Sequence, residues 1–152
     1  AVDNAMIGMR RAIDDAIKDV DDPLDRIALA VRQYLKFFHD HPENVELLIQ
    51  ERAEFRDRKK PTYFTFREAN VERWREVYRE LIRQGRIRDL PVDRISDVLG
   101  DLVYGTMFTN YIAGRKQSLV TQAEGIIDLV FHGLLTPAER SRPRPRHTEK
   151  LP

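Results

Sequence analysis

The chain has 152 residues, with 26 Lys and Arg against 25 Asp and Glu, so its formal charge is only +1. That length fits one domain with a buried core, and a composition of 41% hydrophobic and 34% charged residues is unlike that of a disordered chain. The absence of cysteine excludes disulfides, thiolate metal sites and a cysteine nucleophile, and the longest apolar run, residues 27–31, is far short of the ~20 residues that span a membrane.

Prolines divide the chain into segments that have helical periodicity. Pro23, Pro42, Pro61, Pro91 and Pro137 lie between these segments, where a helix can begin but not continue. No segment alternates apolar and polar residues as a half-buried strand does. The sequence therefore predicts an all-α fold of six helices, near residues 3–20, 23–40, 43–58, 62–84, 92–114 and 118–135.

The second and fourth predicted helices are amphipathic. In the second, the apolar residues from Leu24 to Phe38 recur at the i, i+3, i+4, i+7 spacing of one helix face, and Asp22 is placed to cap its start. The fourth carries one apolar stripe through Trp74 opposite a charged face. Gly85 then predicts a left-handed cap at its end, because glycine takes that conformation at no steric cost.

The last two predicted helices are apolar on nearly all sides. A helix of this kind must be covered all round, and a six-helix chain has few helices to cover it. Gly100, Gly105, Gly125 and Gly133 also lie within them, each costing ~1 kcal/mol relative to alanine, which a close backbone approach would offset. These features predict that both helices pair with their copies in a homodimer. A tight intramolecular core is the alternative.

The end of the chain has a different composition. Residues 136–152 carry five basic residues against two acidic ones, so the rest of the chain is mildly acidic. With Arg-Pro-Arg-Pro-Arg at 142–146, this predicts a disordered basic tail that follows a helical domain at residues 1–135. Because nucleic-acid-binding domains have a basic face, we do not expect the folded body to bind nucleic acid. Attraction of the tail to phosphate is the minor alternative.

The residues offer no metal site and no catalytic group. His39 and His41 lie two positions apart and so point in different directions on a helix, and Asp128 with His132 makes a single i, i+4 pair. No serine lies in a G-x-S-x-G turn, and no glycine-rich phosphate loop is present. We therefore expect no metal, no cofactor and no enzymatic activity. Since no signal peptide opens the chain, we expect a cytoplasmic protein without a membrane partner.

Aromatic residues are in surplus on the second to fifth predicted helices. Several carry a hydroxyl or indole group, and asparagines add uncharged polar groups to otherwise apolar helices. An apolar cavity with a few convergent polar groups is how a small-molecule site is built. The alternative is an ordinary packed core in which the tyrosine hydroxyls reach its edge.

Four stretches share the pattern of one known domain. They are residues 28–48, with Ala28, Val31, Tyr34, Leu35, Phe38, His41 and Pro42; residues 81–89, with Gly85; residues 99–111, with Gly105; and residues 130–135. Together they resemble helices four to nine of the TetR family of transcriptional regulators, which form its ligand-binding and dimerisation domain. The resemblance covers about residues 1–135. The family's N-terminal helix-turn-helix is absent from this sequence, so we expect a fragment of a longer regulator.

The resemblance implies a function and two sets of site residues. We expect the effector-sensing and dimerisation domain of a repressor, which binds a small apolar or aromatic ligand and contacts operator DNA only through the absent head. The implied ligand-binding residues are Tyr34, Phe38, Phe55, Phe66, Asn70, Trp74, Tyr104, Phe108, Asn110 and Tyr111. The implied dimer-interface residues are Gly105, Thr109, Gly125, Leu129 and Gly133.

The implied mechanism is a population shift, in which the ligand favours one spacing of the two DNA-binding heads and the first helix transmits the movement.

Two alternative functions stay open. A stand-alone adaptor that binds a partner helix in an apolar groove would be a monomer with a large exposed apolar patch. A helical enzyme acting on an apolar substrate would need a titratable group with a strongly perturbed pKa in the cavity.

Overall fold

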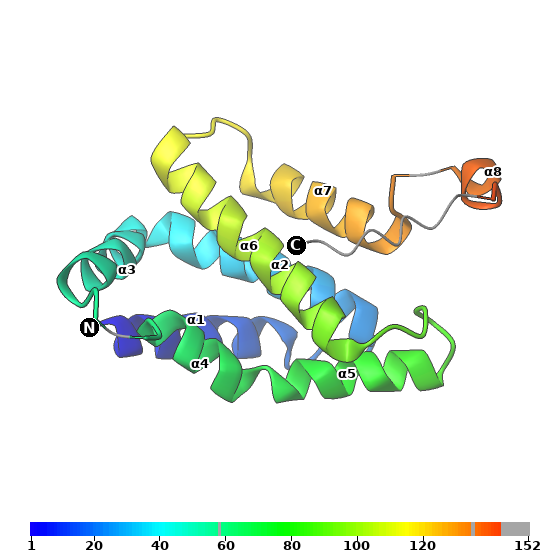
Figure 1. The fold of residues 1–152 in the computed structure, drawn as a ribbon, viewed down its shortest axis with the longest axis horizontal. Helices are drawn as coiled ribbons and strands as arrows, with labels where there is room; N and C mark the ends of the chain where they lie inside the picture. Colours follow the sequence, from blue (N-terminus) through cyan, green and yellow to red (C-terminus); the bar gives the residue numbers. More distant parts are fainter. Residues whose placement is uncertain (58, 135, 144–152) are drawn as a thin grey trace.

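The computed structural model describes residues 1–57, 59–134 and 136–143, which form eight α-helices and no strand (Figure 1). The helices are α1 (Val2–Ile17), α2 (Pro23–Asp40), α3 (Pro42–Glu54), α4 (Thr62–Asn70), α5 (Glu72–Arg83), α6 (Val92–Ala113), α7 (Leu119–His132) and α8 (Pro137–Arg140). The predicted all-α fold is confirmed.

Helix α2 is the centre of the fold. It packs against α1, α3, α6 and α7, and Figure 1 shows α6 crossing it with α1 and α7 on opposite sides. Its apolar stripe is buried, with Leu35 only 2% exposed. As predicted, Asp22 caps its start, because the carboxylate accepts a hydrogen bond from the Leu24 amide at 2.8 Å.

The prediction of one helix at residues 62–84 is wrong, because the chain bends at Val71 and divides it into α4 and α5. No proline or glycine marks this position. The Asn70 side-chain amide instead donates to the carbonyl of Phe66 at 2.7 Å, in the turn that precedes the bend. Such a local bond competes with the backbone hydrogen bonds that would continue the helix.

The other helix ends differ from the predictions by a few residues. Helix α5 ends as predicted in a glycine cap, where Gly85 has φ +67° and the amides of Gly85 and Arg86 bond to the carbonyls of Ile82 and Leu81, both at 2.9 Å. Helices α1 and α3 end earlier than predicted. Within the predicted tail, residues 137–140 form the short helix α8, and most of the Arg-Pro segment lies outside the described residues.

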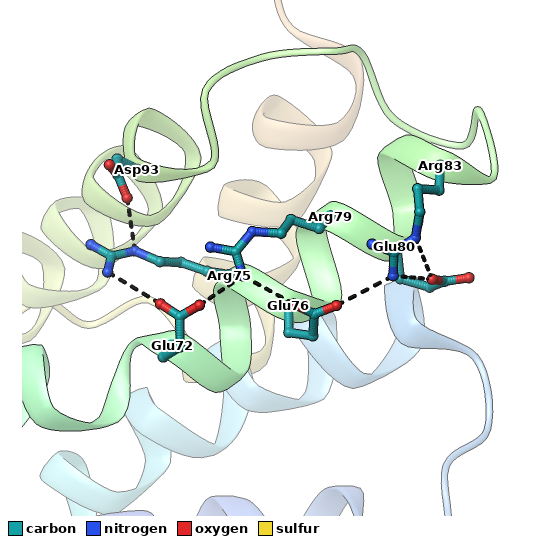
Figure 2. Close-up of polar contacts among 7 residues, drawn as sticks. All are labelled: Glu72, Arg75, Glu76, Arg79, Glu80, Arg83 and Asp93. Carbon is teal, nitrogen blue, oxygen red and sulfur yellow. Dashed lines mark hydrogen bonds and ion pairs between the residues drawn. The ribbon is translucent and has the colours of Figure 1, made fainter.

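A ladder of ion pairs covers the outer face of α5 (Figure 2). Arg79 contacts Glu72 at 2.7 Å and Glu76 at 2.9 Å, and Arg83 continues the series to Glu76 at 3.3 Å and to Glu80. Hydrogen bonds from Arg79 and Arg83 lower the pKa of Glu76 below its ordinary value. These groups are exposed, so the ladder contributes little stability and keeps this face of α5 in water, as the sequence predicts.

Candidate functional site

An apolar cavity of about 160 Å³ lies between α1, α2, α4, α5 and α6. We call it the ligand cavity. The bend at Val71 is part of its wall, because α4 contributes the side before the bend and α5 the side after it. The wall is formed by Met9, Arg10, Ile13, Ile27, Ala30, Val31, Tyr34, Tyr63, Phe66, Arg67, Asn70, Val71, Arg73, Trp74, Tyr78, Ser96, Leu99, Gly100 and Val103.

Two tyrosine hydroxyls pair in the wall of the ligand cavity. The hydroxyl oxygens of Tyr34 on α2 and Tyr63 on α4 are 2.7 Å apart, and both side chains are buried. Burial raises the pKa of Tyr63 to about 12 and holds the pKa of Tyr34 well above its usual range. Burial also raises the pKa of Tyr78 to about 12. All three phenols are therefore neutral at physiological pH.

These shifts predict a loss of stability in alkali. A phenol whose pKa is higher in the folded chain than in the unfolded chain stabilises the fold fully below the unfolded value of 10.0, and this contribution is lost as the pH rises through 10 towards 12. We expect the urea midpoint to fall across this window. Tyrosinate absorbance measured in parallel should show Tyr34, Tyr63 and Tyr78 ionising late, and a folded chain in which all five tyrosines ionise near pH 10 would contradict the burial.

Arg67 is part of the wall of the ligand cavity and contacts α6. Its guanidinium contacts the Asp101 carboxylate at 2.9 Å and donates to the backbone carbonyl of Asp97 at 3.3 Å. The group lies directly over Gly100, where an added Cβ atom would overlap the guanidinium. Gly100 therefore lies in close contact with Arg67 of the same chain. This contact explains the glycine without the close approach to a second copy that the sequence predicted.

Two further arginines line the wall beside α1. Arg10 donates to the Asn70 side-chain oxygen at 2.6 Å, so Asn70 is held from both of its amide atoms. Arg73 pairs with Asp14, and its guanidinium carbon lies 5.4 Å from the centre of the Trp74 ring.

The structure brings four of the ten predicted ligand-binding residues to this cavity: Tyr34, Phe66, Asn70 and Trp74. Tyr104 and Phe108 line a second, wider hollow of about 620 Å³ between α3, α4 and α6, which shares Tyr63 with the first.

The other four predicted residues lie outside both hollows. Phe38 is buried beside Tyr34, with ring centres 5.1 Å apart, and Phe55 is 46% exposed after α3. The Tyr111 hydroxyl donates to the Glu46 carboxylate at 2.5 Å, and the Asn110 side-chain oxygen is buried without a hydrogen-bond partner in the described chain.

Sequence reasoning did not select Tyr63, Arg67, Arg73, Tyr78 or Ser96. Tyr63 and Tyr78 belong to the surplus of aromatic residues, but nothing in the sequence distinguishes them from the other aromatic residues as ligand-binding residues. The arginines and Ser96 carry no motif, since each belongs to the wall only because α4, α5 and α6 pack together.

Helices α6 and α7 expose apolar side chains. On α6, Val98, Leu102 and Ile112 fall on one helical stripe, and Val98 and Ile112 are 54% and 74% exposed. Gly105 and Thr109, two of the predicted interface residues, belong to the same stripe by their spacing. We call this stripe, together with the exposed apolar residues of α7 (Val120, Leu129, Val130 and Phe131), the apolar face.

The remaining predicted interface residues lie on or beside α7. Leu129 is 50% exposed, and Gly125 lies one turn before it, where an added Cβ atom would meet open space. Gly133 has φ +74° and follows the end of α7. The predicted helix at residues 118–135 had placed it within the helix. An exposed apolar surface of this kind is unusual on a monomer and is typical of an interaction site.

The described ranges were compared with what a metal site and a membrane-spanning helix require. Those residues contain no group of three or more His, Asp or Glu that could hold a metal ion. None of their helices combines the length and the apolar character needed to cross a bilayer. Asp128 and His132 contact each other at 3.1 Å on the exposed side of α7, as an ordinary surface pair.

Comparison with known protein families gives a match. Residues 20–107, more than half of the chain, match the model of a family described as the tetracyclin repressor-like C-terminal domain. The matched segment begins just before α2 and ends within α6, so it includes most of the wall of the ligand cavity. No curated protein and no solved structure matches the chain.

Proposed function

The chain belongs to the family of tetracyclin repressor-like C-terminal domains, and from this premise we propose that it is the effector-sensing and dimerisation domain of a repressor. The family is regulatory and is not a family of enzymes. In the proposed cycle, a small apolar or aromatic ligand enters the ligand cavity and alters the affinity for operator DNA of a helix-turn-helix head joined to α1. We place this activity in the cytoplasm.

The observation that carries the proposal is the position of the ligand cavity. Its wall includes Met9 and Ile13 of α1, the helix that would lead to the DNA-binding head, so a bound ligand contacts the element that transmits the signal. It also includes Val31 and Tyr34 of α2, which packs on α7. A ligand that fits one arrangement of these helices better than another shifts the population towards that arrangement.

The apolar face supports the dimerisation part of the proposal. Its exposed apolar residues, together with the open space around Gly105 and Gly125, suit close packing of α6 and α7 against their copies across a two-fold axis. Light scattering over a wide dilution range tests this directly. A dimer that persists on dilution is expected, whereas a well-behaved monomer would favour the stand-alone adaptor.

Trp74→Ala tests the ligand cavity. Toluene has the size and apolarity that the cavity accepts, and the indole ring of Trp74 forms part of the wall. Since burying a large side chain against a ligand contributes about 1.5–3 kcal/mol, we expect toluene affinity to fall by about 10- to 100-fold, measured by NMR titration. Ile7→Ala, on an exposed position of α1, is the control that should leave toluene affinity unchanged.

Unchanged affinity for toluene in the Trp74→Ala protein would show that the ligand site lies elsewhere in the chain. The wider hollow lined by Tyr104 and Phe108 would then be the next region to test.

A further inference from the structure

The wall of the ligand cavity is positively charged. Arg10, Arg67 and Arg73 contribute to it, and none of the described acidic residues does. The partners of Arg67, Asp97 and Asp101, lie outside the wall with side chains 70% and 71% exposed, where water screens their charge. Arg10 and Arg73 both pair with Asp14, which also lies outside the wall and has a side chain that is 40% exposed. An anion in the cavity therefore meets guanidinium groups in the wall itself, whereas their partner carboxylates lie behind them. The same guanidinium groups would repel a cation.

The wall also holds buried hydrogen-bond donors that have no partner among the described residues. Ser96 is 6% exposed, and its hydroxyl has no hydrogen-bond partner in the described residues. The Nε group of Arg73 is likewise buried and unpartnered there, although the guanidinium pairs with Asp14 at its terminal nitrogen. Because an unpaired buried donor is costly, such a wall is suited to a ligand that accepts hydrogen bonds.

The size of the cavity limits the rest of the ligand. A cavity of roughly 150 Å³ lined by apolar side chains holds one benzene molecule. The ligand cavity, at about 160 Å³, therefore accepts an apolar body of about one six-membered ring. Trp74 on α5 and Leu99 on α6 supply apolar contact for that body.

We propose that the effector is a small carboxylic acid, with an apolar body of about one ring and a carboxylate that accepts hydrogen bonds from Arg73 and Ser96. This inference rests on the proposed function, which it deepens by naming the ligand's head group. The ring occupies the apolar part of the cavity, and the carboxylate lies at the donors that are unpaired among residues 1–57, 59–134 and 136–143. The guanidinium groups of the wall then select against cationic compounds of the same shape.

The chain carries its own reporter for the test. Trp74 is its only tryptophan and lines the ligand cavity, so intrinsic fluorescence responds to occupancy of this site. The probes are cyclohexanecarboxylate, cyclohexanecarboxamide and cyclohexylmethylamine, which share one ring and differ in head-group charge. We expect the carboxylate to bind about tenfold more tightly than the amide, the amount by which a charged hydrogen bond exceeds a neutral one, and the amine to bind most weakly.

Two matched variants test whether the carboxylate of the ligand binds at Arg73. Arg73→Gln should lower affinity for the carboxylate about tenfold and leave affinity for the amide unchanged, which also shows that the variant is folded. Arg75→Gln is the control, because Arg75 lies two residues away on α5, pairs with Glu72 and Asp93, and does not line the cavity. It should bind the carboxylate as the natural chain does.

The outcomes separate this inference from the proposed function. Equal affinity for the three probes, or equal losses in Arg73→Gln and Arg75→Gln, would overturn the carboxylate assignment while the cavity stays a ligand site. If none of the three probes nor toluene alters Trp74 fluorescence, the carboxylate assignment and the proposed ligand site both fail.

Discussion

Leu129→Asp is expected to convert the proposed dimer into a folded monomer. Leu129 is 50% exposed on α7 within the apolar face, so in the proposed dimer its side chain is buried against the second copy. The substitution removes about 1.5–3 kcal/mol of apolar burial and adds the cost of an unpaired buried carboxylate, and both effects occur twice across a two-fold axis. The dissociation constant should therefore rise by more than about a thousandfold, measured by sedimentation equilibrium.

The control for this prediction lies on the opposite side of α2. Ile7 on α1 is 42% exposed, similar to Leu129, and is not part of the apolar face. Ile7→Asp should leave the dissociation constant unchanged, and circular dichroism should show full helicity in both variants. A dimer that survives Leu129→Asp with unchanged affinity would rule out α7 as the interface.

Tyr34→Phe is expected to destabilise the fold by about 1–3 kcal/mol, measured by urea unfolding. The substitution removes one of two hydroxyls that are 2.7 Å apart and leaves the Tyr63 hydroxyl buried without this partner. Tyr63→Phe should cost a similar amount, because the Tyr34 hydroxyl would keep only a weak contact to the Met107 sulfur at 3.8 Å.

The double variant gives the sharper test. With both hydroxyls removed, no donor is stranded, so Tyr34→Phe with Tyr63→Phe should be more stable than the sum of the single effects by about 0.5–3 kcal/mol. Strict additivity would show that the two hydroxyls do not depend on each other. Tyr111→Phe is a useful comparison, since its hydroxyl bonds to Glu46 at the surface and its loss should cost less.

The features that could be predicted from sequence are those encoded locally. The spacing of apolar residues on α2, the Asp22 cap and the glycine cap at Gly85 each depend on residues within a few positions of one another. The bend at Val71 could not be predicted because no proline or glycine marks it, and a single asparagine such as Asn70 does not by itself show that its side chain bonds to the preceding turn.

The ligand cavity was only partly predictable for a different reason. The aromatic surplus indicated that a cavity was present, but Arg67 and Gly100 lie 33 positions apart and meet only after α4 packs near α6. Ser96 has no motif, and its importance comes from being buried without a partner. Such properties belong to the packed chain, and a linear pattern does not contain them.

The central place of α2 has a consequence for how a signal would spread. One side of this helix lines the ligand cavity, another packs on α1, and a third supports α7. A ligand that displaced α2 as a rigid rod would move α1 and α7 in a single step, and in the proposed regulator these helices carry the signal and the dimer contact. The size of the response to the effector then depends on how tightly α2 packs against its neighbours. Substitutions that loosen this packing would weaken the response even where they contact neither the ligand nor the second copy.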